Sequence, residues 1–183
     1  MSLDLTTTIE HLYSGTPVYK NELINLLKCE DPQIIELLRS KADSVRQEIY
    51  GTDVYIRGLI EFTNYCKNNC YYCGIRRDNI TATRYRLAPE DILSCCDEGY
   101  KLGFRTFVLQ GGEDGFFPRD KICHIVASIK DKYPDCALTL SIGEWSRADY
   151  QAFYNAGADR YLLRIESSTK KPHFTIFQRK VRQ

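Results

Sequence analysis

The spacing of apolar positions divides the chain into a helical first part and an alternating second part. Steps of three or four residues separate the apolar positions Ile34, Leu38, Ala42, Val45 and Ile49. This spacing predicts a helix with one apolar stripe. Asp31 and Pro32 have the order typical of a helix start, and Gly51 stands where a helix stop belongs. We therefore interpret residues 1–50 as an N-terminal helical cap.

From Asp53 onward, short apolar runs typical of strands alternate with segments that have a helical pattern. The predicted strands are Val54–Thr63, Arg105–Gln110, Ala137–Ile142 and Arg160–Ile165. Strands that alternate with helices of 10–15 residues form βαβ units, whose strands are parallel. The sequence therefore predicts an α/β fold with about four parallel strands.

Polar and glycine-rich stretches follow each predicted strand. A cysteine-containing loop follows the first strand, Gly111–Gly115 the second and Ser141–Trp145 the third, while Arg164 and Glu166 lie at the end of the fourth. In a (β/α) barrel, the carboxyl ends of the strands form one rim, where ligands bind. We therefore expect these four stretches to surround a single site.

Three cysteines in the first of these loops indicate a soft metal centre. Cys66, Cys70 and Cys73 have the spacing C-x3-C-x2-C, and thiolates that converge from one loop bind zinc or iron–sulfur clusters. A structural zinc site needs four ligands, and the motif supplies three. Three thiolates suit a [4Fe–4S] cluster with one iron left open. A zinc site, or cysteines that merely lie close together, remain the alternatives.

Together with Tyr72, which directly precedes the third cysteine, this motif resembles the signature of the radical S-adenosylmethionine (SAM) enzymes. Between Tyr55 and Glu166 the chain is similar to the radical-SAM maturases of [FeFe]-hydrogenase, the HydE family, which is related to biotin synthase. The matching blocks are IEFTNYCKNNCYYCGIRRDN, RYRLAPEDIL, FVLQGGED, LTLSIGEW and NAGADRYLLRIE. The resemblance implies the N-terminal half of a radical-SAM (β/α) barrel.

The resemblance also implies a function. Such an enzyme uses a [4Fe–4S] cluster to cleave SAM reductively to a 5′-deoxyadenosyl radical, here in maturation of the hydrogenase H-cluster. Its expected partners are a small-molecule substrate, an electron donor of the ferredoxin or flavodoxin type, and other hydrogenase maturation proteins. A biotin-synthase-like enzyme is one alternative. The other is a truncated, catalytically incomplete half-domain that binds an iron–sulfur cluster or zinc.

The resemblance assigns a role to each matching residue. Cys66, Cys70 and Cys73 would each bind one iron, and the fourth iron would chelate the amino and carboxylate groups of SAM. Tyr72 would lie near the adenine. The remaining cofactor-binding residues are expected to be Gln110, Gly111, Gly112, Glu113, Ser141, Arg164 and Glu166.

Physical chemistry supports several of these roles. Glycines at 111 and 112 allow the backbone to approach a ligand closely. The resemblance to the family's GGE motif implies that the loop binds the SAM amino group through its backbone and the Glu113 carboxylate. The Arg164 guanidinium can form paired hydrogen bonds with a carboxylate. Asp114, which follows this loop, is assigned either to the site or to the cap of the next helix.

Composition and charge limit the expected size of the domain, its binding partners and its cellular compartment. The chain has 183 residues, enough for one domain with a real core. Its net charge of +1 does not favour nucleic acid or an anionic membrane. No apolar run approaches the roughly 20 residues of a membrane helix, and the N-terminus resembles neither a secretory nor an organellar signal. Eight cysteines without an export signal indicate a reducing cytoplasm.

Residues 51–166 are thus expected to form a partial radical-SAM core. Residues 167–183 contain five Lys or Arg and no acidic residue, and we expect them to be a basic tail outside the family pattern, produced by truncation. Outside the motif, Cys95, Cys96, Cys123 and Cys136 lack metal-ligand spacing and are interpreted as structural.

Overall fold

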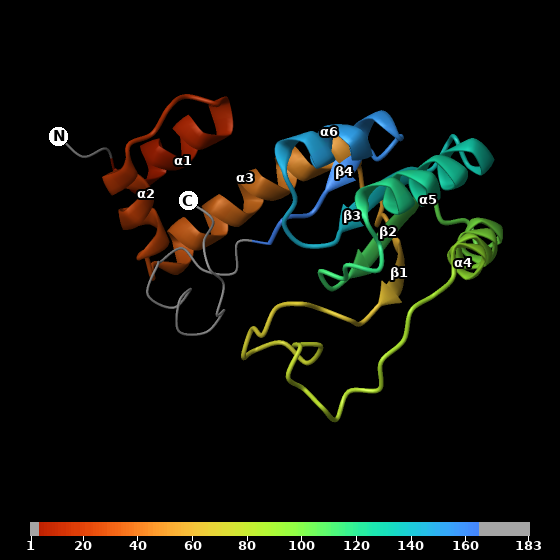
Figure 1. Ribbon diagram of the computed structural model, residues 1–183. Coiled ribbons are helices and arrows are strands. Elements are labelled where there is room, and N and C mark those ends of the chain that lie inside the picture. Colours follow the sequence, from red (N-terminus) through yellow and green to blue (C-terminus); the bar gives the residue numbers. More distant parts are fainter. Residues whose placement is uncertain (1–3, 165–183) are drawn as a thin grey trace. The chain divides into compact units, whose positions relative to one another are not determined.

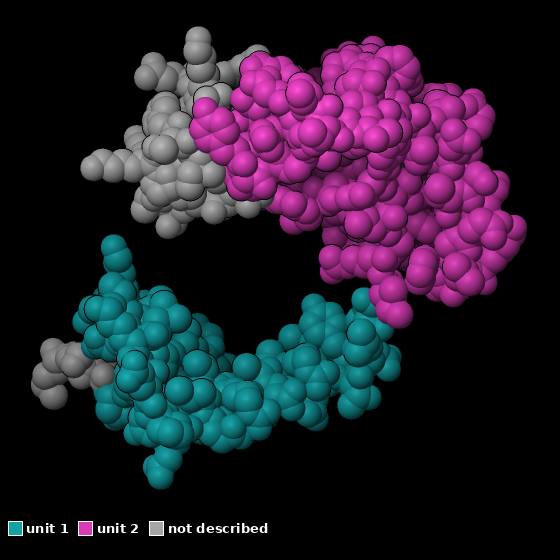
Figure 2. All heavy atoms as spheres, turned by 90° about the horizontal axis from the view of Figure 1, so that it is seen from below, with its two compact units in different colours: residues 1–55 teal, residues 56–183 magenta. Residues whose placement is uncertain are grey.

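The computed structural model describes residues 4–164 (Figure 1). The chain forms two compact units, which meet in sequence between Tyr55 and Ile56 (Figure 2). Glu166 and the predicted basic tail lie outside the described residues. Among the helices of the described part, none combines the length and the apolar character needed to cross a bilayer.

The described residues of the first unit form three helices, α1 (Leu5–Ser14), α2 (Lys20–Leu27) and α3 (Pro32–Tyr50). The predicted start of α3 is confirmed: Pro32 is its first residue, and the Asp31 carboxylate accepts a hydrogen bond of 2.9 Å from the Gln33 amide. Such a cap satisfies an amide group that the first helical turn leaves without a backbone partner. Gly51 ends the helix with a φ of 63°, as the sequence predicts.

Within the described residues of the second unit lies a parallel sheet of four strands in the order β1-β2-β3-β4. The strands are β1 (Gly58–Thr63), β2 (Thr106–Gly111), β3 (Ala137–Ser141) and β4 (Arg160–Tyr161). A helix connects each strand to the next: α4 (Pro89–Lys101), α5 (Arg119–Lys132) and α6 (Arg147–Asn155). The predicted α/β fold with four parallel strands is therefore confirmed.

The first strand is shorter than its apolar run suggested. It begins at Gly58, which pairs with Phe107 of β2, and not at Val54. Val54 and Ile56 are 87% and 66% exposed. A strand extends as far as its hydrogen-bonding partner does, and an apolar run by itself does not reveal that limit.

Helices α4, α5 and α6 cover one face of the sheet (Figure 1). Alternate residues of the strands point to that face, since side chains in a strand have a period of two. The buried strand residues on the helical side are Ile60, Phe62, Phe107, Leu109, Leu138 and Leu140. Burying each such side chain stabilises the fold by about 1.5–3 kcal/mol. The intervening residues, among them Glu61, Gln110 and Ser141, therefore point to the opposite face.

Two adjacent cysteines on α4 provide a test of this core. Cys96 is completely buried, and burial raises the pKa of its thiol to about 12, whereas Cys95 is exposed. Because the thiolate is the reactive form, we expect alkylation of Cys96 at pH 8 to be at least about a thousandfold slower than that of a thiol with the ordinary pKa of about 8.5. Mass spectrometry after timed exposure to iodoacetamide measures both rates. Comparable rates at Cys95 and Cys96 would contradict the packing described here.

Candidate functional site

A cavity of about 330 Å³ lies at the carboxyl ends of the strands. This volume is at the lower end of the range of about 300–1,000 Å³ for small-molecule pockets. Apart from Asp114, every predicted site residue within the described part of the chain lines it. They are Cys66, Cys70, Tyr72, Cys73, Gln110, Gly111, Gly112, Glu113, Ser141 and Arg164. The structure thus brings together four stretches that are far apart in sequence.

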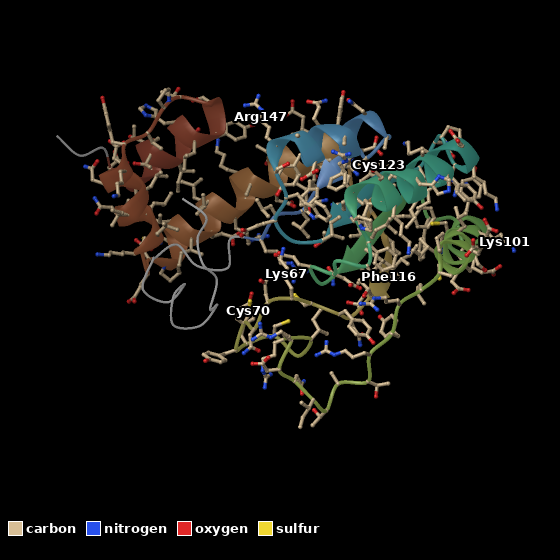
Figure 3. The ribbon with its side chains drawn as sticks, in the orientation of Figure 1. Lys67, Cys70, Lys101, Phe116, Cys123 and Arg147 are labelled. Atoms are coloured by element: carbon tan, nitrogen blue, oxygen red, sulfur yellow. The ribbon has the colours of Figure 1, made fainter. Side chains whose placement is uncertain are left out.

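The cysteine loop leaves the end of β1 and folds into tight turns. The Cys73 amide donates to the Cys70 carbonyl at 3.0 Å, and the Arg76 amide donates to the Cys73 carbonyl at 3.2 Å. Cys70 is buried, and Cys66 and Cys73 are half-buried. Figure 3 shows Lys67 and Cys70 on this loop.

Between residues 4 and 164, no group of three or more His, Cys, Asp or Glu side chains is arranged to hold one metal ion. That finding concerns ligands that share a single ion. In a [4Fe–4S] cluster each thiolate binds a different iron, so its ligands are spread around a larger centre.

The glycine loop after β2 lies directly against the cysteine loop. The Lys67 amide donates to the Glu113 carbonyl at 3.0 Å. A Cβ atom at position 112 would lie 2.2 Å from the Tyr65 carbonyl oxygen and 2.6 Å from the Cys66 Cβ. Glycine is therefore required at position 112, because any side chain would push the two loops apart.

The Glu113 side chain is held at the wall of the cavity and is only 9% exposed. The Lys67 ammonium lies 3.1 Å from its Oε2, and the Glu144 amide donates to its Oε1 at 3.3 Å. Gly143, with a φ of +87°, makes room for it, since a Cβ there would lie 2.1 Å from the Glu113 Cγ. This nearly buried carboxylate thus pairs with the Lys67 ammonium, and its residue lines the cavity.

A row of polar side chains crosses the sheet at its carboxyl end. The Gln110 amide donates to the Glu61 carboxylate at 3.0 Å, and the Arg164 guanidinium donates to the Gln110 carbonyl at 2.9 Å. Register explains the row, because Glu61 pairs with Gln110 and Gln110 with Ser141. Sequence reasoning missed Glu61, which also lines the cavity. Its signal was a charged residue inside an otherwise apolar strand.

Asp114 differs from its expected roles. It does not line the cavity described above. Nor does it cap α5: the residue before that helix is Pro118, and the described residues provide no side-chain cap there. Instead, its carboxylate accepts hydrogen bonds from Thr63 at 2.8 Å and from Arg86 at 2.7 and 2.9 Å. The prediction of a helix cap was therefore wrong.

The structure combines a parallel β/α sheet with a three-cysteine loop at the carboxyl ends of its strands. The sequence comparison identifies the protein family that has these features. Residues 60–183 match the sequence model of the Radical SAM superfamily, and the chain belongs to that family. The match includes residues 167–183, for which the sequence analysis expected no family pattern.

Two curated relatives make the resemblance more specific. The chain is 44% identical over 147 residues to the [FeFe] hydrogenase maturase subunit HydE of Thermotoga maritima, a stretch that covers 80% of this chain and 42% of the relative. It is 31% identical over 135 residues to the 3-methylornithine synthase of Methanosarcina barkeri, covering 72% of this chain and 38% of the relative. The predicted resemblance to the radical-SAM maturases is confirmed. The chain spans about two fifths of the length of these relatives.

Solved structures agree on the fold. HydG, a maturase of the [FeFe]-hydrogenase, matches with a TM-score of 0.86 at 23% identity, covering 97% of this chain and 40% of that one. Methylornithine synthase (PylB) matches with a TM-score of 0.72 at 27% identity, covering 85% of this chain and 46% of that one. The predicted half of a radical-SAM barrel is thus confirmed as the fold class.

The residues present fit the groups that the family implies, a [4Fe–4S] cluster and SAM. Thiolates are the ligands of iron–sulfur clusters, and three of them come from one loop at the cavity. Gly112 lets the glycine loop lie directly against the loop that carries these thiolates, since a Cβ there would lie 2.2 Å from the Tyr65 carbonyl oxygen. A nearly buried carboxylate and a guanidinium, from Glu113 and Arg164, suit the ammonium and carboxylate of an amino acid.

Proposed function

We propose that this chain carries the cluster- and SAM-binding part of a radical SAM enzyme that acts in maturation of the [FeFe]-hydrogenase H-cluster. The observation that carries the proposal is the convergence of the cysteine loop, the glycine loop and the ends of β3 and β4 on one cavity. The 44% identity to a HydE maturase supports the hydrogenase context. In this proposal residues 51–166 form the functional core.

Each group has a defined task. Cys66, Cys70 and Cys73 would hold the cluster. When bound and reduced, the cluster supplies the electron that splits SAM into methionine and a 5′-deoxyadenosyl radical. The chain's own residues bind and orient SAM: Glu113 takes its ammonium group and Arg164 its carboxylate. Tyr72, Gln110, Gly111, Gly112 and Ser141 form the surrounding wall. Glu166, which lies outside the described residues, is assigned to cofactor binding by the family resemblance.

The proposed electron donor and cellular compartment follow from the chemistry of the cluster. The cluster needs a reducing partner, and a ferredoxin- or flavodoxin-type protein supplies electrons at suitable potentials. A reducing cytoplasm also keeps the cysteines available for iron. The substrate is a small molecule, and other hydrogenase maturation proteins are the proposed partners.

Metal analysis combined with a cleavage assay tests this function. We expect the anaerobically reconstituted chain to hold about four irons and four sulfides, and to form 5′-deoxyadenosine from SAM when dithionite supplies electrons. Stoichiometric zinc without iron in the anaerobically purified chain would contradict the cluster assignment. A bound cluster without any 5′-deoxyadenosine would instead support the alternative, a half-domain that does not turn over.

Two glycines with left-handed backbones provide a matched test of Glu113. Gly143 has a φ of +87° and Gly103 a φ of +92°, but only the Cβ of an alanine at 143 would meet Glu113, and nothing lies within 4 Å at 103. Either alanine costs about 1–3 kcal/mol of backbone strain. We expect Gly143→Ala, in addition, to weaken SAM binding at least about tenfold by displacing the carboxylate.

Urea unfolding measures the strain in both variants, and equilibrium dialysis of the reconstituted chains measures their SAM affinity. Equal SAM affinity in Gly143→Ala and Gly103→Ala would show that Glu113 does not contribute to SAM binding.

A further inference from the structure

The short segment Arg84–Tyr85–Arg86 returns toward the sheet after the cysteine loop, and its two arginines reach different parts of the site. The Arg84 guanidinium donates to the carbonyls of Ile75 at 3.0 Å and Arg76 at 2.7 Å. It also donates to the carbonyls of Asn79 and Asn64. These four carbonyls lie on both sides of the cysteine motif in sequence.

The Arg84 guanidinium therefore forms hydrogen bonds with both ends of the cysteine loop. Backbone carbonyls away from a helix or sheet need other donors, and arginine offers five N–H groups in a fixed fork. A lysine at this position has a single ammonium group and cannot span four carbonyls in that geometry.

Asn64, the first residue after β1, is hydrogen-bonded to residues 83 and 85. The Asn64 side-chain amide donates to the Thr83 carbonyl at 2.6 Å, and the Tyr85 amide donates to the Asn64 side-chain oxygen at 2.8 Å. Thr63, which precedes it, forms an isolated antiparallel bridge with Arg86. The loop is thus held where it leaves β1.

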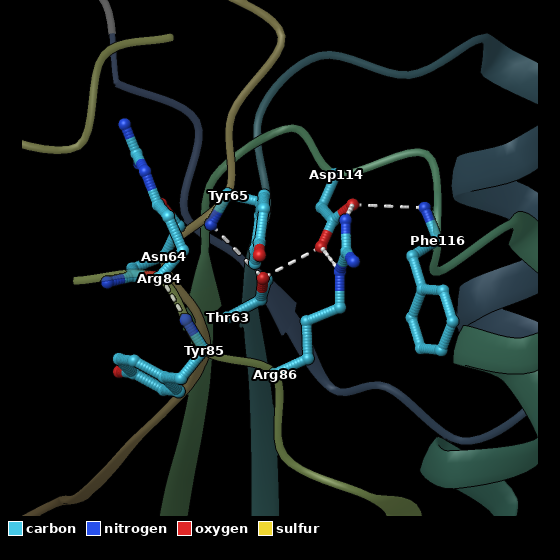
Figure 4. Close-up of polar contacts among 8 residues, drawn as sticks. All are labelled: Thr63, Asn64, Tyr65, Arg84, Tyr85, Arg86, Asp114 and Phe116. Carbon is cyan, nitrogen blue, oxygen red and sulfur yellow. Dashed lines mark hydrogen bonds and ion pairs between the residues drawn. The ribbon is translucent and has the colours of Figure 1, made fainter. Parts of the chain in front are cut away.

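Arg86 turns the other way, toward the loop that follows β2 (Figure 4). Its guanidinium forms two parallel hydrogen bonds with the Asp114 carboxylate, which directly follows Glu113. The guanidinium also lies over the Tyr65 ring, 3.8 Å from its centre, and over the Phe116 ring at 4.7 Å. The Asp114 carboxylate accepts from Thr63 and from the Phe116 amide as well.

The ion pair between Arg86 and Asp114 is largely shielded from solvent on the Asp114 side. The Asp114 side chain is 4% exposed and that of Arg86 is 33% exposed. Burial alone would raise the pKa of the Asp114 carboxyl, but hydrogen bonds from Arg86, Phe116 and Thr63 outweigh it and hold the pKa below its usual range. Paired hydrogen bonds of this kind fix direction as well as distance.

We propose that Arg84 and the Arg86–Asp114 pair are positioning residues, which set the shape of the cysteine loop and its placement against the glycine loop. This proposal rests on the proposed function for the identity of the bound groups. Arg84 acts on the loop that carries the thiolates. Arg86 and Asp114 act on the distance between that loop and Glu113.

The first test uses the chain without iron. In Arg84→Lys, we expect iodoacetamide to alkylate the buried Cys70 about tenfold faster than in the parent chain, because the loop loses hydrogen bonds and opens more often. Arg105→Lys is the matched control. Arg105 also donates to two carbonyls, those of Tyr100 and Phe104, but it directly precedes β2 at the opposite end of the strand.

The second test uses the reconstituted chain. We expect Arg84→Lys to shorten the half-life of the cluster in the presence of an iron chelator about tenfold. We expect Asp114→Asn to retain the cluster and to raise the dissociation constant of SAM about tenfold, because the paired hydrogen bonds with Arg86 are lost. Asp159→Asn is its control, as Asp159 accepts from the Leu138 amide and lies 3.3 Å from the Lys130 ammonium.

The results separate positioning from general destabilisation. Unchanged Cys70 reactivity and cluster half-life in Arg84→Lys, or unchanged SAM affinity in Asp114→Asn, would overturn the proposal for that residue. The same changes in the two control variants would overturn it as well. If the parent chain takes up no iron, the proposed function fails, whereas the Cys70 alkylation rates still decide whether Arg84 shapes the loop.

Discussion

Replacing Cys70 by alanine is expected to remove the iron–sulfur cluster, whereas replacing Cys136 by alanine is not. Both thiols are buried, with exposures of 6% and 2%. Each substitution deletes one buried sulfur, so the two should lower the free energy of unfolding by comparable amounts. Cys70, however, lines the cavity, while Cys136 belongs to the core between the sheet and the helices.

The iron content therefore distinguishes the two roles. After anaerobic reconstitution, we expect Cys136→Ala to hold about four irons per chain, like the parent, and Cys70→Ala to hold less than about one. Iron and sulfide assays, with the visible absorption of the cluster, measure this. Full iron content in Cys70→Ala would exclude Cys70 as a ligand, and loss of iron from both variants would indicate a folding defect.

The second large effect is expected from Gly112→Ala. The added methyl group would lie 2.2 Å from the Tyr65 carbonyl oxygen, and backbone at that position cannot move away without shifting the cysteine loop. Because the two loops are joined by the hydrogen bond from Lys67 to Glu113, both walls of the cavity would move. We expect SAM affinity to fall at least about a hundredfold, since a displacement of this size disrupts several contacts at once.

Gly115→Ala in the same loop is the control. Nothing lies within 4 Å of a Cβ at that position, so this variant should bind SAM within about twofold of the parent. Calorimetric titration of SAM into the reconstituted chains gives both affinities. If Gly112→Ala and Gly115→Ala bind SAM equally well, the close approach of the two loops has no part in binding.

The sequence predicted the convergence of the site for a simple physical reason. Parallel strands place their carboxyl ends on one edge of the sheet, so residues that follow different strands meet there. Gln110, Ser141 and Arg164 illustrate this, since their common position follows from the order of strands and helices. Their roles in binding remain predictions that the experiments above address.

In contrast, the contacts between side chains that are distant in sequence could not be predicted from the sequence pattern. Asp114 was expected in the site or at a helix start, but its partner Arg86 comes from a segment 28 residues earlier. No periodicity relates the two positions, because the path of an irregular loop determines their contact. Glu61 carried a sequence signal, a charge inside a strand, but its partner did not: its hydrogen bond with Gln110 depends on the strand register.

The central claim is that one cavity in this chain holds both a [4Fe–4S] cluster and SAM. Electron paramagnetic resonance of the dithionite-reduced, reconstituted chain, recorded with and without SAM, tests it most directly. If SAM binds to the open iron, its addition shifts the g-values of the cluster signal. A cluster signal that stays unchanged at saturating SAM would contradict the account.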